Sequence, residues 1–200
     1  MSIDQLTTLE TTDITEFIFE AVHPHLKGRI LEMESTSGNI SSLIIENEIP
    51  IHLSNTDSQI RNILHEKFDN NSTVRSIHNI DFHHPEFGQI YTKLAGAFEV
   101  IFHLNIFHHP IDAVSIRNAN LLLKTRGSLI ILLPVNYSTF NNLSIDMRDL
   151  KKYNQKYFAD LFGSSYEIMR ISIINLPKMT HGDTYSQSGL SAIVIARKNG

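Results

Sequence analysis

The sequence predicts an α/β domain in which strands and helices alternate, and three observations support this. Short apolar runs recur along the chain, and segments with apolar residues at helical spacing lie between them. The runs at 98–104 and 128–133 are almost wholly apolar, as strands covered on both faces of a parallel sheet must be. The stretch between the last two runs, near 166–174 and 190–197, is rich in turn residues and has no helical pattern. We therefore expect those two runs to pair as an antiparallel hairpin.

The first part of the chain is predicted to hold an N-terminal helix and three strands. Apolar positions at helical spacing over 13–22 stop before His23-Pro24, because the residue before a proline disfavours the helical conformation. An amphipathic segment follows each of the first two strands, after a loop of small polar residues in the first case and after the capping residues Asn55-Thr56-Asp57 in the second. The predicted strands are 29–33, 51–54 and 73–80, and the predicted helices between them are 39–46 and 58–68.

The second part is predicted to hold two further helices around the strand at 128–133. Asp112 can cap a helix that ends at Lys124, with Gly127 beyond it. A polar loop follows Pro134 and is long enough to suggest a functional role. The second helix is predicted over roughly 147–162.

Composition and charge exclude several classes of function. The 200 residues are 42% hydrophobic, enough for one domain with a full core, and the net charge of −4 gives no electrostatic reason to expect a nucleic acid or an anionic membrane as partner. The chain has no cysteine, which excludes disulfides, thiolate metal ligands and a cysteine nucleophile. The N-terminus has no signal-peptide pattern, and no apolar run approaches the roughly 20 residues of a membrane helix. We expect a single domain over 1–200 in the cytoplasm.

The stretch from Arg29 to Asn39, R-I-L-E-M-E-S-T-S-G-N, predicts a strand, a tight turn and the start of a helix. An α/β protein binds polar or anionic nucleotide-like ligands at such a place. Small residues are favoured in such a loop because its backbone must approach the ligand closely. Glu34 and Thr36 carry side chains there, so the pattern of the fold is intact while the pattern of ligand binding is altered.

The order of the elements and their residues resembles the class I S-adenosylmethionine-dependent methyltransferases over about 14–197. The resemblance implies a doubly wound, Rossmann-like fold with a mainly parallel seven-stranded sheet and one antiparallel strand. It divides the chain into an N-terminal helix and lead-in (1–28), a cofactor-binding half (29–134), and a substrate-side helix with a C-terminal hairpin (135–200). The stretches that carry it are H-P-H-L-K-G-R-I-L-E, F-E-V-I-F-H-L-N-I-F-H-H, L-L-L-K-T-R-G-S-L-I-I-L-L-P and D-L-K-K-Y-N-Q-K-Y-F-A-D-L-F.

The resemblance also implies a site for S-adenosylmethionine at the carboxyl ends of the strands. The family's first loop reads E-x-G-x-G-x-G, in which Glu32 and Gly38 match the acid and the last glycine, whereas Glu34 and Thr36 replace the first two glycines. Glu34 would bring a carboxylate near a ligand that itself carries one, which is repulsive. The expected cofactor-binding residues are Glu32, Glu34, Ser35, Gly38, Asn55, Thr56, Asp81, Phe82 and Asn105.

Three of the positions that the resemblance assigns have a specific role. Asn55 stands where the family has an acid that binds the ribose hydroxyls; it can hydrogen-bond but supplies no charge, so Asn55→Asp would be expected to restore affinity. Asp81 matches the acid beside the adenine amine. His109 is the candidate acid or base of the reaction, because the family places a histidine that faces the cleft there. The alternatives are a helix-capping histidine and, for Glu32 and Asp81, acids that merely end buried strands.

Two classes of function stay open. The first is an S-adenosylmethionine-dependent methyltransferase that acts on a small-molecule or glycan-like acceptor, with binding of the cofactor weak or lost. The second is a pseudoenzyme of the same fold that serves as a binding or partner module, alone or as a homo-oligomer. We expect no metal, since adjacent histidines on an extended segment point to opposite sides and each pair then supplies at most one ligand.

Overall fold

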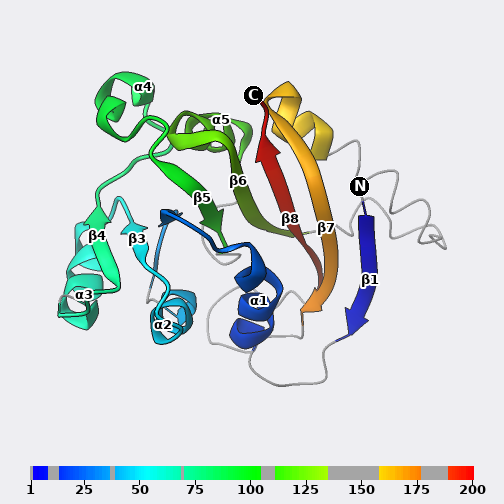
Figure 1. Cartoon of the computed structure of the whole chain (residues 1–200), viewed down its shortest axis with the longest axis horizontal. Helices are drawn as coiled ribbons and strands as arrows, with labels where there is room; N and C mark the ends of the chain where they lie inside the picture. Colours follow the sequence, from blue (N-terminus) through cyan, green and yellow to red (C-terminus); the bar gives the residue numbers. More distant parts are fainter. Residues whose placement is uncertain are drawn as a thin grey trace.

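The computed structural model of the chain describes residues 2–8, 14–36, 39–68, 70–104, 111–134, 158–176 and 189–200. Its strands are β1 (Ser2–Thr8), β2 (Ile30–Glu32), β3 (Ile51–Ser54), β4 (Val74–His78), β5 (Phe98–His103), β6 (Leu123–Pro134), β7 (Tyr166–Leu176) and β8 (Gly189–Lys198). They form one eight-stranded sheet in the order β1-β7-β8-β6-β5-β2-β3-β4 (Figure 1). Only β8 runs antiparallel to its neighbours among these strands. This confirms the predicted α/β fold, mainly parallel with one antiparallel strand.

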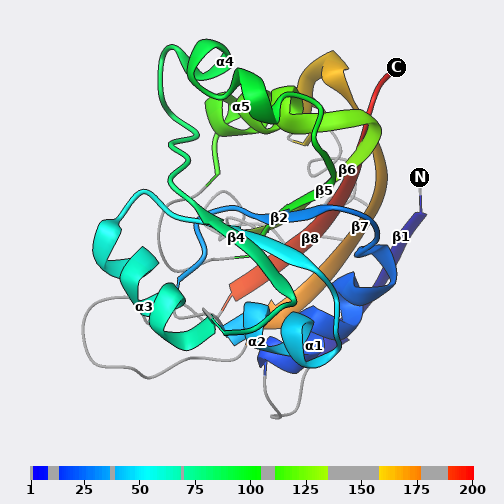
Figure 2. The ribbon, with the colours of Figure 1, turned by 60° about the vertical axis from the view of Figure 1, so that its left-hand side comes forward.

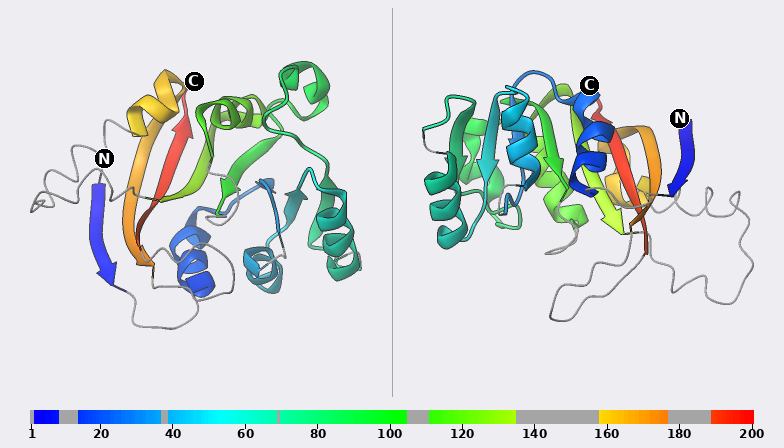
Figure 3. Two further views of the ribbon diagram at one scale, coloured as in Figure 1. Left: turned by 180° about the vertical axis from the view of Figure 1, so that it is seen from behind. Right: turned by 90° about the horizontal axis from the view of Figure 1, so that it is seen from below.

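All seven predicted strands are present, and β1 is an eighth that the sequence pattern does not predict. β1 pairs with β7 in parallel, at the edge of the sheet opposite β4 (Figure 3). Its residues, S-I-D-Q-L-T-T, include only two apolar side chains. A strand added at an edge is held by backbone hydrogen bonds to one neighbour, so it can form without the apolar runs that mark the central strands.

Helices cover both faces of the sheet, as a doubly wound fold requires (Figure 2). Residues that alternate along each strand face opposite cores: Ile30 lies in one core with Ile44, and Leu31 lies in the other with Ile116. The first core is covered by α1, α2 and α3, and the second by α4, α5 and the helical residues 158–162. These helices are α1 (Ile14–Val22), α2 (Asn39–Glu46), α3 (Ser58–Phe68), α4 (Phe87–Ile90) and α5 (Ala113–Leu122).

The predicted helices agree with the structure in the first part of the chain and only partly in the second. The bounds of α2 and α3 are those predicted, and α1 begins one residue later than expected. α4 was not predicted, because a single turn of four residues is too short to show helical periodicity. The helix predicted over 147–162 lies mainly outside the described residues; 158–162 are helical, with Phe158 and Phe162 buried.

The predicted end of the helix at Lys124 is wrong. α5 ends at Leu122, because Leu123 has an extended backbone (φ −73°, ψ 139°) and already begins β6. β6 therefore starts five residues before the predicted 128, and its pairing with β5 shifts register between Phe98 and Val100. Gly127 allows this close approach, since a Cβ there would lie 3.0 Å from the carbonyl oxygen of Glu99.

Candidate functional site

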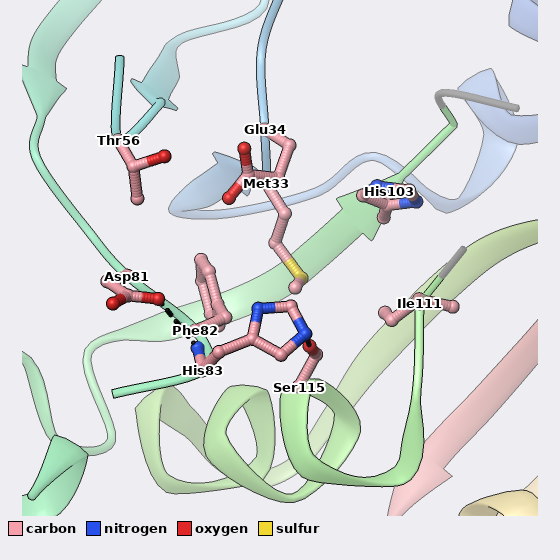
Figure 4. A pocket seen from close by; sticks show the side chains of 9 residues that line it. All are labelled: Met33, Glu34, Thr56, Asp81, Phe82, His83, His103, Ile111 and Ser115. Atoms are coloured by element: carbon pink, nitrogen blue, oxygen red, sulfur yellow. Dashed lines mark hydrogen bonds between the residues drawn. The ribbon is translucent and has the colours of Figure 1, made fainter. Parts of the chain in front are cut away.

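A pocket lies where the parallel strands β2 to β5 end, beside the start of α5 (Figure 4). Ligands of open α/β sheets bind in such a place, outside the carboxyl ends of the strands. Thr56 and Asp81 lie at one side of the pocket, and His103 and Ile111 lie at the other (Figure 4). The lining residues are Met33, Glu34, Thr56, Asp81, Phe82, His83, His103, Ile111 and Ser115.

Glu34 occupies a backbone position that glycine adopts most easily. Its φ is +52°, in the left-handed region, where a side chain costs roughly 1–2 kcal/mol. The turn is tied to the neighbouring strand by Met33, whose N–H donates to the carbonyl oxygen of Phe102 at 2.8 Å. The side chain of Glu34 lines the pocket. The loop thus keeps a glycine-type turn while placing a carboxylate where glycine would leave space.

Ser35 and Asn55 lie behind the pocket and join the turn to β3. The N–H of Ser35 donates to the carbonyl oxygen of Ser54 at 2.7 Å. The side-chain amide of Asn55, 6% exposed, donates to the carbonyl oxygen of Ser35 at 2.8 Å, and its oxygen accepts from the N–H of Asp57 at 2.7 Å. Both ends of the Asn55 amide are therefore engaged with the backbone, and neither Ser35 nor Asn55 lines the pocket.

Glu32 is buried at the end of β2 and contacts α2, not the pocket. The hydroxyl of Ser41, on α2, donates to Oε2 of Glu32. Burial raises the pKa of Glu32 to about 7, although the hydrogen bonds from Ser41 and Ser35 act in the opposite direction. Near neutral pH the Glu32 side chain is thus poised between its protonated and ionised forms.

Asp81 and Phe82 are held in place by α4, by Tyr91 directly after it, and by α5. The N–H of Asp81 donates to the hydroxyl of Tyr91 at 2.9 Å. Phe82 packs against Phe87 with ring centroids 5.5 Å apart, and its carbonyl oxygen accepts from the amide of Asn118 at 2.7 Å. These contacts fix an acid and an aromatic ring in the lining of the pocket. The supporting residues were not predicted; the aromatic pair Phe87 and Tyr91, at i and i+4, was the available signal.

His83 reaches the pocket from the loop after β4 and is anchored to α5. Its Nε2 lies 2.9 Å from the hydroxyl of Ser115 and 3.5 Å from Oδ1 of Asp112. Asp112 is also the N-cap of α5, as the sequence predicts, because its side chain accepts from the N–H of Ser115 at 2.8 Å. Neither His83 nor Ser115 was among the expected site residues.

His103 ends β5 as a buried histidine on the wall of the pocket. It is 3% exposed, and burial lowers its pKa to about 4, so it is neutral at physiological pH. Its Nδ1 has no hydrogen-bond partner among the described residues. A buried polar atom without a partner costs free energy, which a ligand group or a water molecule that reaches it would recover. The signal in the sequence was a histidine near the end of a strand that is apolar except for Glu99.

Three expected site residues, Gly38, Asn105 and His109, lie outside the described residues. Of the expected residues that are described, Glu34, Thr56, Asp81 and Phe82 line the pocket. Within the described ranges, no group of three or more His, Cys, Asp or Glu side chains is placed to hold a metal ion. None of the helices in those ranges is long and apolar enough to cross a membrane.

No sequence-family model and no curated protein matches this chain, but solved structures do. A S-adenosylmethionine-dependent methyltransferase from Methanosarcina mazei superimposes with a TM-score of 0.64 at 12% identity, over 90% of this chain and 97% of the other. The chain has the class I methyltransferase fold. A Bacillus halodurans protein proposed to be a methyltransferase has a TM-score of 0.63 at 13% identity, over 94% and 99% of the two chains. The CurJ carbon methyltransferase has a TM-score of 0.55 at 15% identity, and the superposition covers 94% of this chain and 53% of that one.

The lining of the pocket fits a nucleoside better than an amino-acid carboxylate. Met33, Phe82 and Ile111 supply apolar surface, and Asp81 supplies an acceptor for amino or hydroxyl groups. No described residue of the lining is a lysine or an arginine. Arg61, on α3, donates instead to the backbone carbonyl oxygens of Asn55 and Thr56, at 3.0 and 2.7 Å.

Proposed function

We propose that this protein is an S-adenosylmethionine-dependent methyltransferase-like protein whose pocket holds the adenosyl part of the cofactor. The observation that carries the proposal is the position of Asp81 and Phe82, an acid and an aromatic ring at the strand ends of a class I methyltransferase fold. Phe82 and Met33 offer apolar surface to a purine ring, and Asp81 accepts hydrogen bonds from it. When bound, S-adenosylmethionine supplies a methyl group on a positively charged sulfur.

The acceptor side of the proposed site is formed by α5 and the end of β5. Methyl transfer needs little more from a protein than alignment of the two reacting groups, so these residues would act by holding the acceptor. His103, kept neutral by burial, can make one hydrogen bond through Nδ1 to a polar group of a small-molecule or glycan-like acceptor. His83, anchored by Ser115, offers a second polar group beside it.

Two observations favour weak binding of the cofactor and keep a catalytically silent binding module as the second candidate function. Glu34 brings a carboxylate to the pocket, and the amide of Asn55 is used to hold the loops together. The carboxylate of Glu34 repels the carboxylate of S-adenosylmethionine. The amide of Asn55 offers the ribose hydroxyls no charged acceptor. We expect the dissociation constant for S-adenosylmethionine to be weaker than micromolar, which corresponds to less than about 8 kcal/mol of binding free energy.

Thermal unfolding in the presence of adenosyl compounds tests the proposal. S-adenosylmethionine and 5′-methylthioadenosine, at concentrations about ten times their dissociation constants, should raise the melting temperature, since ligand binding then adds roughly 1.4 kcal/mol of stability. ATP and NAD, whose phosphates meet an acidic pocket, should not. Asp81→Asn should reduce the shift, whereas Asp160→Asn, an exposed residue of the helical segment 158–162, should not change it. The absence of a shift with every adenosyl compound would leave the partner-module function in its place.

A further inference from the structure

The acidic and basic side chains among the described lining residues of the pocket have one sign. Glu34 and Asp81 contribute carboxylates, and none of the described lining residues is a lysine or an arginine. His103 contributes no positive charge at neutral pH, because burial holds its pKa near 4. The imidazole of His83 lies 3.5 Å from a third carboxylate, that of Asp112. The described wall of the pocket is therefore acidic, which disfavours an anionic group within it.

The carboxylate of Glu34 is held at the pocket by the backbone on both sides of it. Met33 is bonded to Phe102 of β5, and Ser35 is bonded to Ser54 of β3, at 2.8 and 2.7 Å. The amide of Asn55 adds a third bond, to the carbonyl oxygen of Ser35. Since the turn is fixed at these points, Glu34 cannot leave the pocket by a movement of the loop without breaking them. The carboxylate of Glu34 therefore stays at the pocket.

The side chain of His103 gives a second, independent indication of the ligand. It is buried, it lines the pocket, and its Nδ1 has no partner within the described parts of the chain. A neutral imidazole has one nitrogen that accepts a hydrogen bond and one that donates. A ligand with N–H groups can satisfy an accepting Nδ1 and a carboxylate of the same pocket at once. The acidic lining favours a positively charged ligand, and His103 favours a ligand or acceptor that brings a hydrogen-bonding group to its Nδ1.

We infer that the pocket selects an adenosyl compound whose side chain carries positive charge and no carboxylate over S-adenosylmethionine itself, an inference that rests on the proposed function. The methionine part of S-adenosylmethionine has an ammonium group and a carboxylate; decarboxylation removes the anion and keeps the ammonium and the sulfonium. Beside Glu34, the decarboxylated compound gains attraction and loses repulsion. It binds more tightly than S-adenosylmethionine by about tenfold or more, a factor of ten being 1.4 kcal/mol.

Titration calorimetry with four compounds separates the effects of the three charged groups of the ligand side chain, the sulfonium, the ammonium and the carboxylate. 5′-Methylthioadenosine has none of them, S-adenosylhomocysteine has the ammonium and the carboxylate without the sulfonium, and S-adenosylmethionine has all three. The decarboxylated compound has the sulfonium and the ammonium alone. The expected order of affinity is decarboxylated S-adenosylmethionine, 5′-methylthioadenosine, S-adenosylmethionine and S-adenosylhomocysteine. The gap between the first and the third should shrink in high salt, because screening weakens interactions between charges.

Glu34→Gln assigns the selection to one residue, since it removes the charge and keeps the size of the side chain. It should reduce the roughly tenfold preference to about threefold or less, mainly by improving the binding of S-adenosylmethionine. Glu48→Gln is the matched control, because Glu48 is also a glutamate at positive φ (57°) but is exposed in the turn after α2. Glu34→Gly gives the same test in a variant in which backbone strain is relieved, should the Gln variant fold poorly.

The results distinguish the inference from the function on which it rests. Equal or tighter binding of S-adenosylmethionine, relative to its decarboxylated form, overturns the inference while the adenosyl site stands. An unchanged preference in both Glu34→Gln and Glu34→Gly also overturns it. Failure of all four compounds, 5′-methylthioadenosine included, to bind the unmodified protein overturns the proposed function together with the inference.

Discussion

At the scale of single residues, Glu34 combines a cost in folding with an effect on the ligand. Its φ of +52° places it where glycine is easiest, and its carboxylate lines the pocket. The sequence shows only that a glutamate replaces a glycine of the family's loop. That the backbone keeps the glycine-type turn follows from the hydrogen bonds on both sides of it. Glu34 is thus a side chain at a backbone position that glycine would adopt most easily.

Glu34→Gly should stabilise the protein by about 1 kcal/mol, because it removes the strain of a side chain in the left-handed region. Glu48→Gly, at φ +57° and away from the pocket, should give a similar gain. Urea unfolding of the two variants measures both effects. Only the first should also change the binding of adenosyl compounds. A loss of stability on Glu34→Gly alone would mean that the glutamate makes contacts worth more than the strain.

Asn55→Asp should destabilise the protein by about 1–3 kcal/mol, whereas the resemblance in sequence implies only that it restores affinity for the cofactor. The new carboxylate cannot donate to the carbonyl oxygen of Ser35, so the bond that joins the two loops is replaced by repulsion. Asn71→Asp is the control: the oxygen of Asn71 accepts from the N–H of Thr73 at 2.9 Å, and an aspartate can do the same. Equal unfolding free energies of Asn55→Asp and the parent would show that the amide is not needed, and tighter ligand binding would restore the first expectation.

At the scale of elements, Glu32 couples β2 to α2 in a way that depends on pH. Burial raises its pKa to about 7 from an ordinary value near 4.5. The folded state therefore binds the proton more tightly, and this contribution to stability is complete below pH 4.5 and is lost as the pH rises through 7. His52, on β3, acts in the opposite direction: burial lowers its pKa to about 4, so its contribution is present above 6.5 and lost as the pH falls toward 4.

Glu32→Gln should flatten the alkaline side of the stability profile. Glutamine keeps the size of the side chain and an oxygen that accepts from Ser41 but has no charge to bury. The variant should be more stable than the parent by between about 1 and 3 kcal/mol above pH 7 and nearly equal to it below pH 4.5. Chemical unfolding across this range provides the measurement. A parallel loss of stability with pH in the parent and the variant would place the titrating group elsewhere.

At the scale of the whole molecule, the fold could be predicted because each central strand is an apolar run and each long helix has an apolar face. β1 and α4 could not, since one is a polar edge strand and the other a single turn. The location of the site could be predicted from the sequence, but the full set of residues that line it could not. Which side chains face the pocket depends on the path of each turn, so Asn55 and Glu32 point behind it while Glu34 and Asp81 line it. His83 belongs to the site through its contact with Ser115, 32 residues away, and no local pattern reveals that.

The central claim, that the pocket over the ends of β2 to β5 holds an adenosyl group, is tested most directly by a crystal structure with bound 5′-methylthioadenosine. This compound lacks the carboxylate that the acidic pocket opposes, so it reports on the adenosyl site alone. We predict electron density for the purine against Phe82 and Met33, with Asp81 in hydrogen-bond contact with it. A purine bound away from the ends of these strands, or a pocket that remains empty at saturating ligand, would contradict the account.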